Sequence, residues 1–242
     1  MRNDAAVILD VDGTLVDSND AHARAWVEAF ADYGITVAFD HVRRSIGMGG
    51  DKLMPQVSGI EESSELGERI SARRAQLFKE RHLPEIQPFP RTRELLERLA
   101  GDGFVLAGAS SAKEDELGPL LERAGVSDLL SRRTSSDDAE RSKPEPDIVV
   151  AALKQTGCAS DRSVMIGDTA YDVTAARHAG IEIVGLECGG WTRESLAGAI
   201  AVYRDPADLL TSYRDSVFPS LAHGNSTTDG VPATGGDGWS PP

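Results

Sequence analysis

The sequence predicts an α/β protein whose parallel sheet is covered by helices on both faces. Two observations support this: short runs of apolar, often β-branched residues recur along the 242-residue chain, and helical patterns separate them. Such alternation is typical of parallel strands joined by right-handed helical crossovers. Because these sheets place their sites at the carboxyl ends of the strands, the residues that follow each expected strand are the first candidates for function.

The expected elements follow from local patterns. Short apolar runs predict strands at residues 7–9, 104–107, 163–166 and 181–184. Helical patterns occupy residues 91–100, 114–124, 147–155 and 172–179. A glycine lies just past each of these helices, at Gly101, Gly125, Gly157 and Gly180. Glycine ends a helix readily because it adopts the left-handed conformation without steric cost.

Residues 18–88 interrupt the alternation. They contain no convincing strand pattern, whereas Trp26, Phe30 and Tyr33 recur at helical spacing. We therefore expect a helical insertion, packed as a subdomain and acting as a lid. The core would then consist of residues 1–17 and 89–220.

Residues 221–242 are expected to form a disordered tail. From His223 onward the chain is rich in Gly, Ser, Thr, Pro and Asp, and Val231 and Trp239 are its only bulky apolar residues. Such a segment buries too little apolar surface to offset the entropy lost on ordering.

Composition narrows the class of protein. The net charge of −14 argues against nucleic acid, which binds through Lys and Arg. No apolar run has the length of a membrane span, and Asp10 and Asp12 interrupt any secretory signal, so a cytoplasmic protein is expected. Cys158 and Cys188 show no metal-binding or redox spacing. Nothing in the sequence indicates an obligate protein partner.

Two carboxylates follow the first expected strand. Asp10 and Asp12 are two residues apart, so in an extended segment their side chains point to the same side. An Asp-Gly turn alone would account for Asp12. The pair is harder to explain in that way, because like charges at this distance need a cation or a shared proton.

Polar residues also follow the other strands. Ser110 and Ser111 precede a helix, where hydroxyls and free N–H groups suit a phosphate or simply cap the helix. Lys143 is held on a short loop by the proline after it, although such lysines are common at surfaces. Asp168 ends the third strand and Asp172 follows one helical turn later; hard oxygen ligands there suit Mg²⁺, and a helix cap is the alternative.

Taken together, these segments resemble the four motifs of the haloacid dehalogenase-like (HAD) superfamily. The matching residues are Asp10-Val11-Asp12-Gly13-Thr14, Ser110, Lys143-Pro144 and Gly167-Asp168 with Asp172. They occur in the family's order, and the resemblance covers about residues 5–212. It implies a Rossmann-like parallel-sheet core with a small all-α cap domain inserted after the first strand.

The resemblance also implies roles. Asp10 would be the nucleophile that forms an aspartyl-phosphate, and Asp12 would act as acid and then base. Mg²⁺ would be bound by Asp10, Asp168 and the backbone carbonyl of Asp12. Asp172 would not bind the ion itself but would orient water bound to it. Phosphate would be held by Ser110, Ser111 and Lys143.

The position of the insertion resembles the cap of the phosphoglycolate phosphatase and β-phosphoglucomutase branch. By that similarity His22 positions Asp12; alternatively, His22 packs inside the cap beside Trp26. Gly49 and Gly50 permit close approach of a substrate, and Lys52 would meet its anionic end. An ordinary turn between helices is the alternative for this stretch.

The expected function is therefore Mg²⁺-dependent hydrolysis of a small phosphorylated metabolite, of the phosphoglycolate or sugar-phosphate type. A sugar phosphomutase of the β-phosphoglucomutase type is the alternative, and a non-catalytic binding protein of the same fold is a third. Asp12 argues against dehalogenases and phosphonatases, which lack the second acidic residue of this motif.

Overall fold

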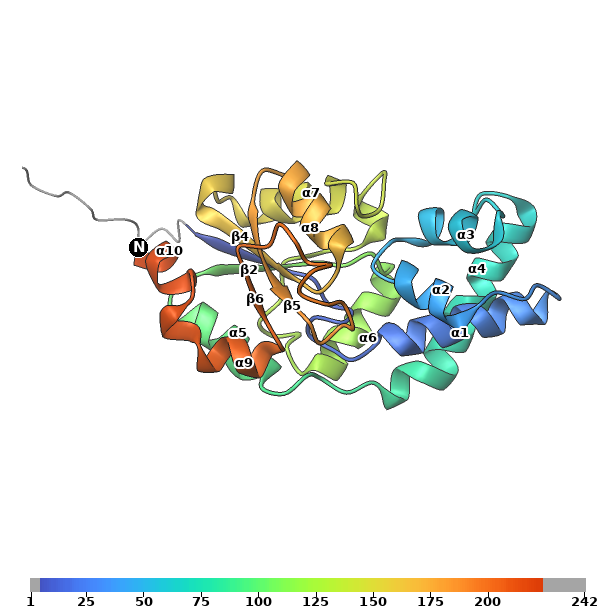
Figure 1. The fold of residues 1–242 in the computed structure, drawn as a ribbon, viewed down its shortest axis with the longest axis horizontal. Coiled ribbons are helices and arrows are strands. Elements are labelled where there is room, and N and C mark those ends of the chain that lie inside the picture. The colour runs from blue at the N-terminus through green and yellow to red at the C-terminus, as the bar shows by residue number, and fades with distance from the viewer. Residues whose placement is uncertain (1–4, 224–242) are drawn as a thin grey trace, which may run out of the picture.

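The computed structural model describes residues 5–223, and a parallel sheet lies at its centre (Figure 1). The six strands have the order β3-β2-β1-β4-β5-β6, and every neighbouring pair is parallel. The strands are β1 (Ala6–Leu9), β2 (Val105–Ala109), β3 (Arg133–Thr134), β4 (Ser163–Gly167), β5 (Glu182–Leu186) and β6 (Ala201–Tyr203). The predicted fold class is confirmed. The sequence patterns missed β3 and β6, which are only two and three residues long.

Helices cover both faces of the sheet, as Figure 1 shows. Val7 and Leu9 of β1 belong to the same apolar cluster as residues of α5 (Thr92–Gly101), α6 (Glu114–Ala124) and α9 (Pro206–Thr211). Ile8, between them, belongs to a second cluster with α7 (Asp147–Thr156) and α8 (Ala170–His178). Successive side chains of a strand point to opposite faces, so the central strand β1 contributes to both layers of the core.

The helix ends agree with the expected pattern, with two exceptions. Gly125, Gly157 and Gly180 all have positive φ beyond their helices. Gly101, by contrast, is the last residue of α5, and Gly103 adopts the left-handed conformation instead, with φ of 90°. Helix α8 begins two residues earlier than expected, because Thr169 caps it and places Asp172 in its first turn.

The insertion consists of helices joined by short loops. Its elements are α1 (Asn19–Asp32), α2 (Phe39–Ser45), α3 (Gly50–Ser58), α4 (Glu65–Leu77), η1 (Phe78–His82) and η2 (Leu83–Glu85). Trp26, Phe30, Ile70 and Phe78 are buried between them. In Figure 1 these helices lie together at one end of the molecule, beyond the sheet. We refer to residues 18–88 as the helical segment.

The chain leaves the sheet through β6, α9, η5 (Tyr213–Asp215) and α10 (Phe218–His223). Phe218 is fully buried, with its ring 5.7 Å from that of Tyr213 and 5.9 Å from that of Phe104. Helix α10 therefore corrects the expected disorder for residues 221–223. The rest of the predicted tail, residues 224–242, lies outside the described residues.

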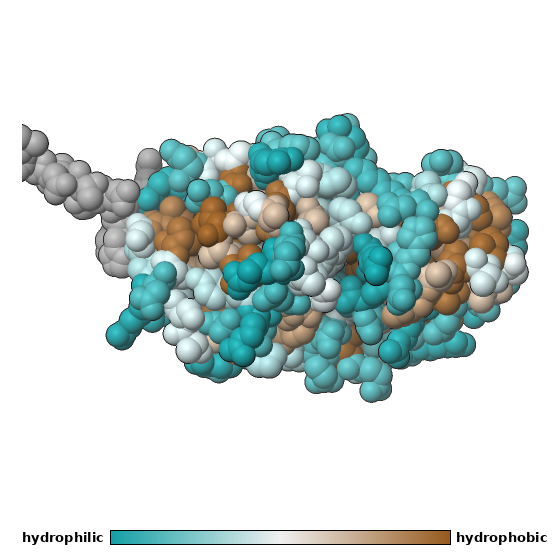
Figure 2. Space-filling model, in the orientation of Figure 1, coloured by the Kyte–Doolittle hydropathy of each residue, from teal (hydrophilic) through white to brown (hydrophobic). Residues whose placement is uncertain are grey.

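Within residues 5–223, none of the helices has both the length and the apolar character that a membrane crossing requires. On the side shown in Figure 2 most of the surface is hydrophilic, and apolar residues gather mainly toward the two ends of the molecule.

Candidate active site

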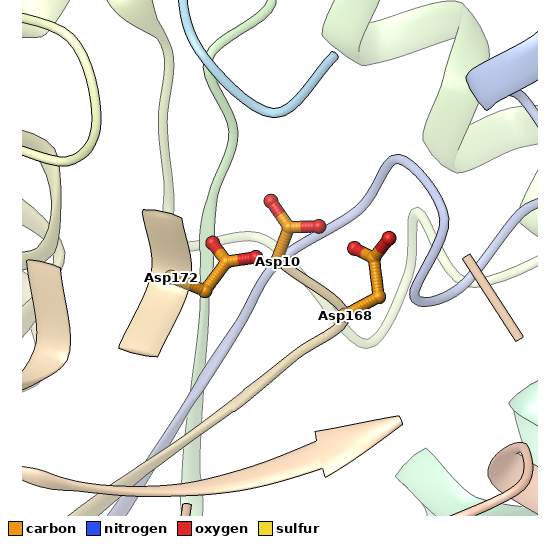
Figure 3. Close-up of side chains that lie close together, drawn as sticks. All are labelled: Asp10, Asp168 and Asp172. Carbon is orange, nitrogen blue, oxygen red and sulfur yellow. The ribbon is translucent and has the colours of Figure 1, made fainter. Parts of the chain in front are cut away.

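Three carboxylates converge at the carboxyl edge of the sheet. Asp10 follows β1 and Asp168 follows β4, its neighbour, while Asp172 lies in the first turn of α8. Each offers an oxygen that lies within 4.8 Å of the other two, and their exposed fractions are 5%, 0% and 1% (Figure 3). We call these residues the acid cluster. Its position follows from the parallel pairing of β1 and β4, which brings both strand ends to one place.

Lys143 is the cation that the fold brings to this cluster. Its Nζ lies 2.6 Å from Asp10 Oδ1 and 2.8 Å from Asp172 Oδ1, and it donates a hydrogen bond to the carbonyl of Ala109 at 2.8 Å. The residue is fully buried, on the loop before α7. A buried ammonium is tolerated only with such partners, so its position is tightly determined.

Two further residues contact the cluster. Thr14 Oγ1 lies 3.0 Å from Asp10 Oδ2 and 3.1 Å from Asp168 Oδ1. Asn19 Nδ2 donates to Asp168 Oδ2 at 3.0 Å and to the carbonyl of Gly189 at 3.1 Å. Neither Asn19 nor Gly189 was among the residues predicted from sequence to have a role. The only local signal was the placement of Asn19 at the start of a helix soon after the first motif.

Asp12 lies apart from the acid cluster and has its own set of donors. Its carboxylate accepts hydrogen bonds from Ser18 at 2.5 Å and Ser110 at 3.3 Å, and lies 2.8 Å from His22 Nε2. The ring of His22 is stacked on Phe78, with centroids 4.0 Å apart. His22 thus contacts Asp12 and also packs inside the helical segment, so its surroundings are compatible with both alternatives and its role stays a prediction.

The other residues predicted to bind phosphate or substrate, apart from Lys143, make contacts with neighbouring protein groups. Ser110 is buried beside Asp12, while Ser111 Oγ donates to the carbonyl of Gly47 at 3.0 Å and so joins the sheet to the helical segment. Lys52 Nζ donates to the carbonyl of Ser142 at 2.9 Å and lies 3.6 Å from Glu145. The ammonium of Lys52 thus contacts two residues of the loop before α7.

Gly49 and Gly50 lie at the start of α3, facing protein atoms. A Cβ on Gly49 would lie 2.6 Å from Cβ of Ser142, and one on Gly50 would lie 2.6 Å from Oε1 of Glu62. These glycines therefore allow a close approach of other side chains of this chain, and both also line a cavity of about 550 Å³.

Burial controls the electrostatics. It raises the pKa of Asp10 to about 7, against the opposing effect of Lys143, and Asp172 and Asp12 raise it further. The pKa of Asp168 is also raised, by burial and by the charges of Asp10 and Asp172. Burial tends to raise the pKa of Asp12 as well, but His22, Ser18 and Ser110 outweigh it and hold that pKa below its usual range.

The acid cluster fits a divalent cation. Among the described residues, three buried carboxylates face one buried ammonium. The pKa values of Asp10 and Asp168 are raised mainly by burial and further by the neighbouring carboxylates, so a cation that offsets this charge would be favoured. Carboxylate oxygens are the ligands that Mg²⁺ prefers. The side chain of Asp12 is not part of this set; the ligand expected from that residue is its backbone carbonyl.

Comparison with known proteins agrees with the fold and the motifs. The family model described as "Haloacid dehalogenase-like hydrolase" matches residues 7–186. A phosphoglycolate phosphatase of Yersinia pestis is 31% identical over 224 residues, which cover 86% of this chain and 95% of the relative. A probable phosphatase IndB of Dickeya dadantii is 30% identical over 201 residues, covering 80% and 85% of the two chains.

A solved structure is similar over the same region. The crystal structure of a hydrolase from Pseudomonas syringae matches with a TM-score of 0.81 and 34% identity, covering 87% of this chain and 98% of that one. The family model spans all four motif regions that supply Asp10, Ser110, Lys143 and Asp168. The chain belongs to the haloacid dehalogenase-like hydrolase family.

Proposed function

We propose that this protein is a Mg²⁺-dependent phosphatase of small phosphate monoesters and that Asp10 is its nucleophile. The observation that carries the proposal is the environment of Asp10. Its carboxylate ends the central strand, with Lys143 at 2.6 Å from Oδ1 and Thr14 at 3.0 Å from Oδ2. Both groups orient a carboxylate that is otherwise surrounded by like charge. The phosphatase names of the relatives at 30% and 31% identity support the same reaction.

In the first half of the reaction an oxygen of Asp10 attacks phosphorus. The new O–P bond forms as the bond from phosphorus to the leaving oxygen breaks, which yields an aspartyl-phosphate and an alkoxide. Lys143 offsets the negative charge brought together in this step. Asp10, Asp168 and the Asp12 carbonyl would hold Mg²⁺, which when bound would supply further positive charge at this place. Asp172 holds Lys143 in place, because its Oδ1 lies 2.8 Å from Nζ.

Asp12 moves the protons. As acid it protonates the leaving alkoxide, and as base it then takes a proton from the water that attacks phosphorus. That attack breaks the bond between phosphorus and Asp10, releases inorganic phosphate and restores the carboxylate. His22, 2.8 Å from Asp12, orients this side chain, and Ser110 and Ser111 contribute hydroxyls for the phosphate.

The helical segment acts as a cap over this site. The contacts that join it to the core include Arg74 with Glu116 at 2.7 Å, Lys52 with the Ser142 carbonyl at 2.9 Å, and Ser111 with the Gly47 carbonyl at 3.0 Å. Trp26, His22 and Arg74 line, together with Asp10 and Asp12, a cavity of about 40 Å³. So small a space must open for a substrate to enter.

The test is phosphate release from a panel of phosphorylated metabolites and p-nitrophenyl phosphate. We expect turnover with Mg²⁺, loss of turnover with EDTA and none with Asp10→Asn, since an amide is a poor nucleophile. Analysis of the glucose 1-phosphate reaction distinguishes released phosphate from glucose 6-phosphate, the product of a mutase. Full activity of Asp10→Asn, or in metal-free buffer, would contradict the proposal.

A further inference from the structure

A second, larger cavity lies beside the cavity that contains Asp10. We call the 40 Å³ space the inner cavity and this one the outer cavity, which has a volume of about 550 Å³. Arg74 and Ser111 line both. The outer cavity is bounded by α3 and α4 on the helical segment and by the loops after β2 and β3 on the core.

This arrangement gives the outer cavity a definite part in the proposed reaction. The phosphoryl group has to reach Asp10 in the inner cavity, whose volume leaves no room for the rest of a metabolite. The leaving group of the ester therefore extends past Ser111 and Arg74 into the outer cavity. The side chains that line it are the ones that meet the leaving group.

The lining is acidic. Its carboxylates are Asp51, Glu61, Glu62, Glu68, Asp137 and Glu140. Its cationic side chains are Arg74 and Lys113, which leaves a formal charge of minus four. Five serines add hydroxyl groups that both donate and accept hydrogen bonds. A cavity lined by one sign of charge concentrates ligands of the opposite sign and repels ligands of the same sign.

Two cationic side chains of this region, Arg74 and Lys52, are already bound to other groups of the protein. Arg74 makes two hydrogen bonds to Glu116, at 2.8 and 2.7 Å, and its guanidinium lies 5.0 Å from the ring centroid of Trp26. Glu116 is only 1% exposed, so drawing Arg74 toward a carboxylate would leave a buried charge without its partner. Lys52, the sequence-based candidate for an anionic substrate, instead bonds the carbonyl of Ser142.

We propose that the outer cavity selects esters whose leaving group carries no negative charge, meaning polyols, amides or amines, and that it discriminates against carboxylates. This inference rests on the proposed phosphatase function and narrows its substrate class. By this inference, 2-phosphoglycolate, the substrate that the name of the Yersinia pestis relative indicates, is a poor substrate for this protein. Its glycolate group would bring a carboxylate into the acidic lining.

The experiment compares esters of matched size. Initial rates of phosphate release are measured with Mg²⁺ for 2-phosphoglycolate, for its carboxamide and for phosphoethanolamine, with p-nitrophenyl phosphate as the reference. We expect kcat/KM for the amide and the amine to exceed that for 2-phosphoglycolate by roughly tenfold or more at low salt. The ratio should shrink as salt is raised, because the lining carboxylates are largely exposed and screened.

Two variants on one helix localise the effect. Glu68 lines the outer cavity and Glu65 does not, although both lie in the first turn of α4. Glu68→Lys should bring the amide-to-carboxylate ratio several-fold closer to unity, whereas Glu65→Lys should leave it unchanged. If the two variants change the ratio equally, the discrimination depends on the overall charge of the protein and not on the outer cavity, and the inference is overturned.

The outcomes separate the two levels of the proposal. Equal or faster hydrolysis of 2-phosphoglycolate, with p-nitrophenyl phosphate also hydrolysed, overturns the inference and leaves the phosphatase function standing. Failure to release phosphate from every ester, the reference included, overturns the phosphatase function and the inference with it.

Discussion

At the scale of single residues, Asp12 differs from Asp10 and Asp168 in the direction in which its pKa is shifted. Ser18, Ser110 and His22 all contact its carboxylate, and its pKa is held low, while the pKa values of Asp10 and Asp168 are raised. Asp12 therefore rests as a carboxylate and must gain a proton before it acts as an acid. His22 Nε2 lies within hydrogen-bonding distance of this carboxylate, at 2.8 Å.

Replacing Asp12 by Asn tests this role. The substitution keeps the backbone carbonyl and the shape of the side chain but removes proton transfer. We expect turnover of alkyl phosphates to fall by roughly 10²–10⁴-fold, with Mg²⁺ binding nearly unchanged. Formation of the phosphoenzyme from p-nitrophenyl phosphate should fall much less, because its leaving group hardly needs protonation. Rapid-quench measurement of phosphoenzyme formation separates the two half-reactions, and equal losses for both esters would argue against Asp12 as the acid.

At the scale of elements, the loop after β5 supports the acid cluster from outside. The carbonyl of Gly189 accepts hydrogen bonds from Asn19 at 3.1 Å and from Arg43 of α2 at 2.6 Å. Asn19 also donates to Asp168. A Cβ on Gly189 would lie 1.6 Å from Oδ2 of Asp168, so only glycine leaves room for that carboxylate.

Gly189→Ala should therefore displace Asp168. We expect Mg²⁺ affinity to fall by roughly 10–100-fold, which is typical when a residue that orients a metal ligand is replaced. The concentration of Mg²⁺ that gives half-maximal phosphate release measures the effect, and calorimetric titration checks it. Gly101→Ala is the matched control, because a Cβ there meets nothing within 4 Å. Unchanged metal affinity in Gly189→Ala would show that Asp168 does not hold the ion.

At the scale of the whole molecule, metal binding should stabilise the fold. An ion that binds only the folded protein at 100 times its Kd contributes about 2.7 kcal/mol. For a chain of this size that corresponds to a rise in Tm of roughly 5–10 °C. Thermal denaturation with EDTA and with Mg²⁺ measures the rise. Asp168→Asn should lose most of it, and an undiminished rise in that variant would place the ion elsewhere.

Access to the site is also a property of the whole molecule. In the proposed function the helical segment is a cap over Asp10; it contacts the core through pairs such as Arg74 with Glu116, and the inner cavity has a volume of about 40 Å³. A phosphate group on a folded protein cannot reach Asp10, because the protein around it is too large to fit between the helical segment and the core. We expect free phosphoserine to be hydrolysed far faster than the same group in a folded phosphoprotein, compared by kcat/KM. Similar values for the two would contradict a closed cap.

Much of the fold and of the candidate site follows from local sequence. Apolar runs predicted β1, β2, β4 and β5 to within two residues at each end, because buried parallel strands need continuous apolar segments. The parallel arrangement then placed Asp10, Ser110 and Asp168 at one edge of the sheet, since their strands all end there. The two-residue spacing of Asp10 and Asp12 likewise predicted that their side chains lie on the same side, and both line the inner cavity.

Only the tertiary structure decided the partner of each side chain. Asn19 and Asp168 are 149 residues apart, and Lys143 lies 133 residues from Asp10, so no local pattern links them. The direction of Lys52, toward Ser142, depends on how the helical segment packs against the core. The short strands β3 and β6 and the helix α10 exist through pairing and packing with distant residues. Local sequence selects backbone conformation and the burial of each face, whereas the contacts that tune charge and shape a cavity form only when separate segments meet.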